Sequence, residues 1–297
     1  MVSSKIMDFN ADLVDDLARQ KVVLFLGSGV SASCKTRAGQ QIRQWEPFLQ
    51  FAAGKIKDKS LKSLVKQSLE QRDYLMACDL IREALGTEWT DLLKQEYQQV
   101  GEPSALHKAL VKLEQRIVVT TNFDKLLESA WEQFSGSATH FPQVTTKIDH
   151  KAFAALRDVK GKFLIKLHGS IDDPDSMVFT KSDYADRAFG NWAYNEFLRV
   201  LLLTHTFLFV GFSMTDPAIS LLVEQYAQSF PTARPHYMLV GGKVHDRLIE
   251  WNKKLRRLYV LPYKSDNNHA ELPRLLTALG KKASERRREL LAASNQA

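Results

Sequence analysis

The chain has 297 residues, of which 44% are hydrophobic, a composition typical of a globular protein with a substantial buried core. Two cysteines, Cys34 and Cys78, are too few for a four-cysteine zinc site or a secreted disulfide framework, so we expect no structural metal. The net charge of +7 favours contact with anions, but its excess gathers at 55–66 and 281–288, which are more typical of solvated helix faces than of a nucleic-acid patch.

No leader or membrane-spanning segment is predicted. The first eight residues contain no apolar stretch of signal-peptide length. The most apolar region, 197–214, is interrupted by Arg199, Thr204 and His205. We therefore expect a cytoplasmic protein without a membrane contact.

Helical and strand-like patterns follow one another along the chain. Leu13, Val14 and Leu17 predict a helix within 9–20, which leads into a strand at 21–26. From residue 42 to residue 111 apolar side chains recur every three or four positions, which predicts a block of helices inserted after the first strand. Further along, the patterns predict strands at 116–121, 162–167, 206–211, 236–241 and 257–262, and helices at 123–134, 192–204, 216–229 and 245–254.

This alternation predicts the fold class. Strands that alternate with helices favour an α/β fold with a Rossmann-like, doubly wound and mainly parallel sheet. We expect a single domain over residues 1–297, with a helical subdomain inserted at about 42–111. A basic C-terminal tail at about 281–297 is expected to form a surface helix or a frayed end.

Four of the predicted strands end in polar or glycine-rich segments. Because the carboxyl ends of parallel strands meet at one edge of a sheet, where open α/β sheets bind ligands, we expect one shared cleft. The four segments are 27–31, 121–124, 168–170 and 211–216.

The first segment, Gly-Ser-Gly-Val-Ser, has the form of a phosphate-binding turn. Gly27 and Gly29 let the backbone approach a pyrophosphate closely, and a helix beginning at Ser31 would direct its amide groups at the anion. A simple tight connection has the same sequence, so this motif alone leaves both interpretations open. The acidic residue that dehydrogenases carry at the end of the second strand is not evident, which disfavours a dehydrogenase.

Asn122, Asp124 and His168 each allow two interpretations. Asn122 and Asp124 offer donors and acceptors to ribose hydroxyls or a carboxamide, whereas Asn122 taken alone is interpreted as the cap of a helix through 125–127. His168 is either a core histidine with satisfied hydrogen bonds or a general base near neutral pH. Their combination at strand ends favours the functional interpretation.

The fourth strand end carries Ser213 and Asp216, with Pro217 in the first turn of the next helix. Asp216 is interpreted equally as a helix N-cap and as a ribose contact. The two roles are compatible.

In this order the four segments resemble the NAD-binding motifs of sirtuins over about residues 20–265. The segment 72–80, Arg-Asp-Tyr-Leu-Met-Ala-Cys-Asp-Leu, further resembles the bacterial sirtuin-like branch used in antiphage defence. Sirtuin deacylases carry a four-cysteine zinc module after the His-Gly motif, but residues 170–192 contain no cysteine. The resemblance therefore implies hydrolysis of NAD+ to nicotinamide and ADP-ribose, with NAD as the substrate and no metal.

The resemblance also implies a role for each site residue. His168 is the general base, and Asn122 positions the attacking water or the ribose. The implied NAD-binding residues are Gly27, Ser28, Gly29 and Ser31 at the phosphates, Asp124 at the carboxamide or ribose, Ser213 and Asp216 near the adenosine ribose, and Thr121 and Gly211 beside them.

The chemistry of the reaction agrees with such a site. Cleavage of the bond between ribose and nicotinamide creates an oxocarbenium-like centre, and nicotinamide leaves as a neutral molecule. The reaction therefore needs a held ribose, a positioned water and a group that removes a proton, but neither a strong acid nor a metal.

Partners follow only from the resemblance. In length and form the chain resembles the sirtuin-like partners of HerA-type hexameric ATPases or helicases, which implies a homo-oligomer in a hetero-complex with such an ATPase. The alternatives are a non-catalytic NAD- or ADP-ribose-binding subunit of a nucleic-acid-processing complex, and a protein deacylase or ADP-ribosyltransferase. Direct contact with nucleic acid stays open.

Overall fold

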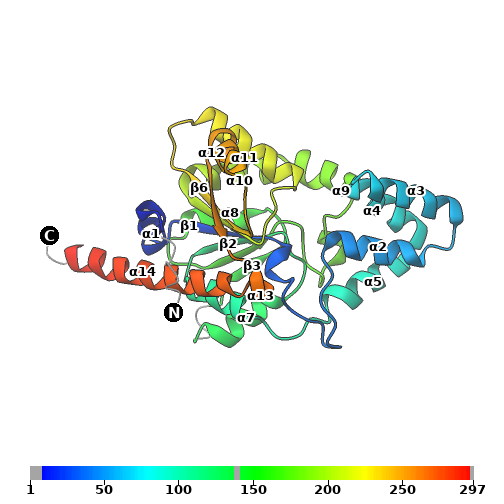
Figure 1. Ribbon diagram of the computed structural model, residues 1–297, viewed down its shortest axis with the longest axis horizontal. Helices are drawn as coiled ribbons and strands as arrows, with labels where there is room; N and C mark the ends of the chain where they lie inside the picture. The colour runs from blue at the N-terminus through cyan, green and yellow to red at the C-terminus, as the bar shows by residue number, and fades with distance from the viewer. Residues whose placement is uncertain (1–8, 137–140, 295–297) are drawn as a thin grey trace.

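The computed structural model describes residues 9–136 and 141–294, and its centre is a seven-stranded sheet (Figure 1). All neighbouring strands are parallel, in the order β3-β4-β2-β1-β5-β6-β7. The Rossmann-like parallel sheet predicted from the sequence is confirmed. Its strands are β1 (Val22–Leu26), β2 (Ile117–Thr120), β3 (Gln143–Thr145), β4 (Phe163–Lys166), β5 (Thr206–Val210), β6 (His236–Gly241) and β7 (Leu258–Tyr263).

Successive side chains of each strand enter opposite layers of the core. In β1, Val22, Leu24 and Leu26 pack with the helices of one layer, whereas Val23 and Phe25 pack with those of the other. Both faces are covered, which explains the continuous apolar runs in the sequence. The first layer contains α1 (Ala11–Ala18), α6 (Ala105–Lys112), α7 (Leu126–Phe134) and α14 (Glu271–Ser294); the second contains α8 (His150–Arg157), α10 (Trp192–Thr204), α11 (Pro217–Ser229) and α12 (Asp246–Arg256).

Four further helices form a separate layer, which we call the helical layer, on one side of the molecule in Figure 1. Its core contains Phe48, Cys78, Ile81 and Trp89 and extends to Phe179, which follows β4. The helices are α2 (Trp45–Lys55), α3 (Lys59–Glu70), α4 (Tyr74–Leu85) and α5 (Thr87–Tyr97).

The helical layer is joined to the short helix α9 (Lys181–Tyr184) by polar contacts. Asp79 of α4 accepts hydrogen bonds from the Lys181 backbone N–H at 2.9 Å and from Ser182 Oγ at 3.2 Å. Arg82 of α4 forms an ion pair with Asp183 at 3.1 Å. These contacts fix α9 to α4.

The short helices α9 and α13 (Asp266–His269) were not predicted, and neither were β3 and α8. Strand β3 has three residues, two of them exposed, so it lacks the apolar run that marks a buried strand. Helix α8 has eight residues and buries only Ala152 and Ala155, which gives a weak periodic pattern. Both elements lie toward the edge of the sheet that β3 forms.

Helix α14 carries the predicted basic tail as far as Ser294. Arg286 pairs with Asp15 at 2.9 Å and Arg287 pairs with Glu114 at 3.0 Å, so part of its charge is neutralised within the fold. Residues 1–8, on which the expectation about a leader rests, and residues 295–297 lie outside the described residues. Within 9–136 and 141–294, no helix is long and apolar enough to cross a membrane.

Candidate active site

A cavity of about 2160 Å³ opens at the carboxyl ends of β1, β2, β4 and β5 and extends from the helical layer to α6 and α14. Its volume exceeds the roughly 300–1,000 Å³ of ordinary small-molecule pockets, so it has room for a dinucleotide. All the predicted site residues except Gly27 line it. The structure thus brings together the four strand ends.

Gly27, Gly29 and Gly211 allow the ends of β1 and β5 to touch. The Gly29 N–H donates to the Gly211 carbonyl oxygen at 2.9 Å. A Cβ added at Gly27 would lie 2.5 Å from that oxygen, and one added at Gly211, whose φ is +62°, would lie 2.6 Å from the Val30 nitrogen. Gly27 therefore serves the contact between the two turns, while Gly29 and Gly211 also line the cavity.

The predicted helix at Ser31 is wrong. A single 3-10 turn, Ser28–Val30, follows β1, and the next α-helix begins only at Trp45. Apolar periodicity also restarts only near Trp45, and the Ser31 side chain turns inward to Asp124 instead of leading a helix. A phosphate at this turn would meet the turn's own backbone and hydroxyl groups and no helix dipole.

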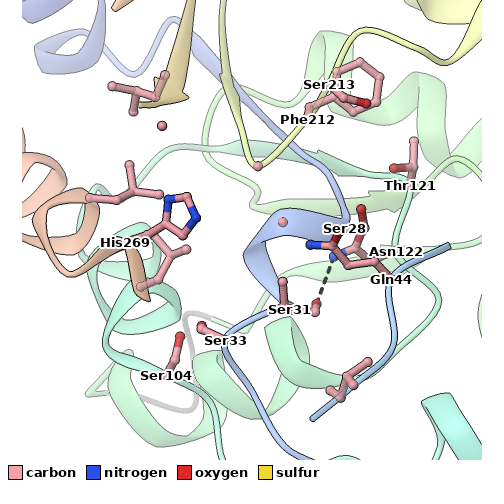
Figure 2. A pocket seen from close by; sticks show the side chains of 18 of the residues that line it. Ser28, Ser31, Ser33, Gln44, Ser104, Thr121, Asn122, Phe212, Ser213 and His269 are labelled. Carbon is pink, nitrogen blue, oxygen red and sulfur yellow. Dashed lines mark hydrogen bonds between the residues drawn. The ribbon is translucent and has the colours of Figure 1, made fainter. Parts of the chain in front are cut away.

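Asn122 is held by both hydrogens of its side-chain amide group. Its Nδ2 donates to the Gly27 carbonyl oxygen at 3.1 Å and to Ser31 Oγ at 3.0 Å, the bond drawn dashed in Figure 2. Its Oδ1 accepts no hydrogen bond from a described residue and is not among the fully buried unpartnered atoms. Asn122 lines the cavity, so this carbonyl oxygen is the atom that it offers to a ligand.

The interpretation of Asn122 as a helix cap is wrong, because Lys125 is the N-cap residue of α7 and the side chain that accepts from the start of the helix is that of Asp124. Asp124 Oδ1 accepts from the Leu126 backbone N–H at 3.0 Å at the start of α7. Its Oδ2 accepts from Ser31 Oγ at 2.7 Å. The carboxylate thus orients Ser31, which in turn holds Asn122; its contact with a carboxamide or ribose stays a prediction.

Lys166 stabilises the loop that contains Asn122 and Asp124. The sequence analysis did not identify it as a site residue. Its Nζ donates to the carbonyl oxygens of Phe123 at 3.2 Å and Asp124 at 2.6 Å, and pairs with Glu128 at 3.1 Å. Its side chain is 1% exposed. A lysine within the otherwise apolar strand 163–167 was the signal that could have identified it.

His168 lies against the carboxylate of Asp216. The Nε2 atom is 3.2 Å from Asp216 Oδ2 and is fully buried, and it makes no hydrogen bond of regular geometry with a described residue. Asp216 is also the N-cap of α11, accepting from the Ile219 N–H at 3.1 Å, and it accepts from the Tyr184 hydroxyl at 2.6 Å. The N-cap role is confirmed, and Tyr184 is a further residue that the sequence did not indicate.

The surroundings of Asp216 and Tyr184 shift the pKa values of both side chains. Burial by itself raises the pKa of the Asp216 carboxyl, but contact with His168 and the hydrogen bonds from Tyr184 and Ile219 outweigh it, and the pKa is lowered overall. Burial and the neighbouring Asp216 charge raise the pKa of Tyr184 well above its usual range. Asp216 is therefore an ionised acceptor and Tyr184 a neutral donor at neutral pH.

Ser213 and Thr121 are among the remaining predicted residues of the cavity. Ser213 Oγ hydrogen bonds with Thr215 Oγ1 at 2.7 Å, and both residues are exposed. Thr121 and Ser213 both line the cavity, as labelled in Figure 2. The hydroxyls of Thr121 and Ser213 do not take part in a buried hydrogen-bond network, so both can contact a ligand.

Aromatic rings form the wall between the helical layer and His168. Phe123 and Phe179 stack with centroids 4.2 Å apart, and Trp45 stacks on Phe179 at 5.0 Å. The centroid of Phe123 lies 6.4 Å from that of His168. A flat, uncharged leaving group would find an apolar surface here. Among the described residues no group of three or more His, Cys, Asp or Glu is placed to hold a metal ion.

Part of the chain is similar to known proteins. Residues 116–259 match a family described as the SIR2-like domain, a range that includes Asn122, His168 and Asp216 but not the glycine turn. NAD(+) hydrolase ThsA of Enterococcus faecium is 32% identical over 161 residues, 54% of this chain and 32% of that protein. ThsA of Bacillus cereus (strain MSX-D12) is 29% identical over 150 residues, 50% of this chain and 30% of that protein.

A third relative matches a longer part of the chain at lower identity. Defense-associated sirtuin 2 of Bacillus subtilis is 20% identical over 228 residues, 75% of this chain and 21% of that protein. The chain spans about a third of the length, or less, of these curated relatives. The similarity therefore concerns one portion of larger proteins.

Proposed function

We propose that the protein hydrolyses NAD+ to nicotinamide and ADP-ribose in this cavity, and that it is a cytoplasmic antiphage-defence effector that depletes NAD+ when activated in a complex. The observation that carries the proposal is that Asn122 offers its carbonyl oxygen to the same cavity as His168. The names of the relatives, NAD(+) hydrolase and defense-associated sirtuin, support the substrate and the setting.

The mechanism follows from these groups. The bond between ribose C1′ and the nicotinamide nitrogen breaks, and its electron pair leaves with neutral nicotinamide. Water attacks C1′ and loses one proton to His168, while Asn122 Oδ1 accepts a hydrogen bond from that water or from a ribose hydroxyl. The products are nicotinamide, ADP-ribose and a proton. The glycine turn, Thr121 and Ser213 supply polar contacts for the rest of the dinucleotide.

The proposal extends to assembly. We infer a homo-oligomer that forms a complex with a HerA-type hexameric ATPase. The basis is the resemblance of the chain, in length and form, to the sirtuin-like partners of such ATPases. Exposed apolar side chains support a protein partner: Trp192 at the start of α10 is 74% exposed, and Leu248 and Trp251 of α12 are also exposed. Direct contact with nucleic acid is tested by whether any DNA affinity falls steeply with salt.

The decisive experiment is chromatography of nicotinamide released from NAD+ by the purified chain, alone and with the candidate ATPase. Asn122→Ala and His168→Ala are each expected to reduce release by at least about 100-fold. His150→Ala, an exposed histidine at the start of α8, is the matched control and is expected to leave release unchanged. Full release by either cavity variant would reject the mechanism.

A result without turnover is also informative. If the wild-type chain releases no nicotinamide in either condition but binds ADP-ribose by calorimetry, the non-catalytic binding subunit replaces the hydrolase. That binding would be expected to survive His168→Ala, because a purely binding cleft has no need of a proton acceptor.

A further inference from the structure

The carboxylate of Asp216 lies against the Nε2 atom of the His168 ring, and both residues line the cavity. Asp216 Oδ2 is 3.2 Å from Nε2, and the side chains of both residues are 8% exposed. We propose that Asp216, held by the Tyr184 hydroxyl, positions His168 and sets which of its ring nitrogens carries the proton. This inference rests on the proposed function, and it gives Asp216 a positioning role in place of a contact with the adenosine ribose.

The two ring nitrogens of His168 have different surroundings. Nε2 is fully buried, and the carboxylate described beside it is that of Asp216. Nδ1 makes no hydrogen bond with a described residue and is not fully buried, and His168 lines the cavity. An ionised carboxylate beside Nε2 favours the tautomer with hydrogen on Nε2. Nδ1 is then left unprotonated toward the substrate, as a general base must be.

Asp216 is itself held on two sides. Its Oδ1 caps α11 through the Ile219 N–H at 3.1 Å, and its Oδ2 accepts from Tyr184 at 2.6 Å. The lowered pKa of the carboxyl keeps it an acceptor at the pH of the reaction. Tyr184 also packs its ring edge-on against the His168 ring, with centroids 5.4 Å apart. The ring is therefore restrained from two directions.

Two neighbouring aromatic residues are consistent with this assignment. Phe123, beside β2, is uncharged, and its ring is tilted by 32° relative to the His168 ring. Tyr194 of α10 is buried near Asp216 and its hydroxyl has no partner, so it adds no charge. Asp216 is thus the one charged side chain described in contact with the ring.

The test uses Asp216→Asn, which retains the size of the side chain and an oxygen for the α11 cap. Its amide would donate to Nε2 and favour hydrogen on Nδ1, the wrong tautomer for a base. We expect kcat for nicotinamide release to fall about 100- to 10,000-fold, with KM for NAD+ changed less than about threefold. Tyr184→Phe, which removes one donor, is expected to lower kcat about tenfold or less.

Tyr226→Phe is the matched control, because its hydroxyl donates to a backbone oxygen of Arg234, away from the cavity. It is expected to leave both constants unchanged. A raised KM with normal kcat in Asp216→Asn would overturn the positioning role and indicate a ribose contact instead.

A readout without turnover separates this inference from the proposed function. Nitrogen-15 NMR of the histidine rings is expected to show hydrogen on Nε2 of His168 in the wild type and a shift toward Nδ1 in Asp216→Asn. An unchanged tautomer in the variant, or hydrogen on Nδ1 in the wild type, would overturn the inference. Absence of nicotinamide release by the wild type would reject the hydrolase alone.

Discussion

Asn122 and Ser31 share a hydrogen bond of 3.0 Å that joins the end of β2 to the turn after β1. The Ser31 hydroxyl donates in turn to Asp124 at 2.7 Å, so one serine orders both polar residues of the second strand end. The catalytic amide proposed here is therefore oriented by a residue that follows another strand.

Replacement of Ser31 by alanine tests that orientation. The change leaves the buried Asp124 Oδ2 and one Asn122 hydrogen without their partner, which is expected to cost about 1–3 kcal/mol of unfolding free energy. Nicotinamide release is expected to fall about tenfold because Asn122 loses one of its two restraints. Urea unfolding and the release assay measure the two effects. Ser284→Ala, an exposed serine of α14, is the control; equal activity of the two variants would contradict the prediction.

Gly211→Ala is expected to disrupt the cleft. The residue has φ of +62°, and an added Cβ would overlap the Val30 nitrogen and the Gly29 backbone. We expect a loss of at least about 2 kcal/mol of stability and weaker binding of ADP-ribose by calorimetry. Gly54→Ala in α2 meets nothing within 4 Å and is expected to raise stability by up to about 1 kcal/mol. Unaltered ADP-ribose affinity in Gly211→Ala would argue against a ligand site at this turn.

Lys166→Met removes a buried charge that supports the Asn122 loop. Glu128 would keep only Lys125, 3.7 Å away, and the carbonyl oxygens of Phe123 and Asp124 would lose their donor. We expect about 3–5 kcal/mol of destabilisation in urea unfolding, partly recovered when Glu128→Gln is added. Lys66→Met, at an exposed position of α3, should change stability by less than about 0.5 kcal/mol. A similarly small effect at Lys166 would show that the loop does not depend on it.

Two buried histidines predict how stability depends on pH. Burial lowers the pKa of His107 to about 4 and that of His236 to about 3, whereas both titrate near 6.5 in an unfolded chain. Below pH of about 6.5 the unfolded chain binds protons that the folded protein does not. The free energy of unfolding therefore has its full value above that pH and falls as the pH drops toward about 4. At pH of about 5 the loss is about 2 kcal/mol per histidine.

Urea unfolding at several pH values between about 7.5 and 5 measures this loss. His107→Gln retains the acceptor of the capping box with Ser104 and is expected to reduce the slope. A wild-type unfolding free energy that does not change over this range would show that the two rings are not buried as neutral groups.

The strands of the sheet could be predicted because they are buried on both faces, so apolar runs such as Val22–Leu26 stand out from their surroundings. The convergence of polar strand ends follows from the same parallel topology. The short edge strand Gln143–Thr145 has no such run and was missed. A glycine turn is compatible with several continuations, and here it leads into a 3-10 turn instead of the expected helix.

Side-chain partners were much harder to predict than strand ends. Tyr184 and Asp216 are hydrogen-bonded although they lie 32 residues apart in the sequence. Lys166 and the Asp124 carbonyl oxygen are hydrogen-bonded across a separation of 42 residues. Such contacts depend on how the loops pack in three dimensions, and periodicity contains no information about them. The sequence therefore indicated candidate residues for the cleft, while the atoms that each one offers to a ligand required the structure.

The attachment of α9 to α4 has a consequence for control of the site. Tyr184 is the last residue of α9, whose preceding residues are held by Asp79 and Arg82. Through Tyr184, the helical layer therefore helps to hold His168 in place, as the sheet does. In the proposed mechanism, a protein that displaces α4 would move Tyr184 away from Asp216 and slow proton removal without touching the dinucleotide, which is allosteric control.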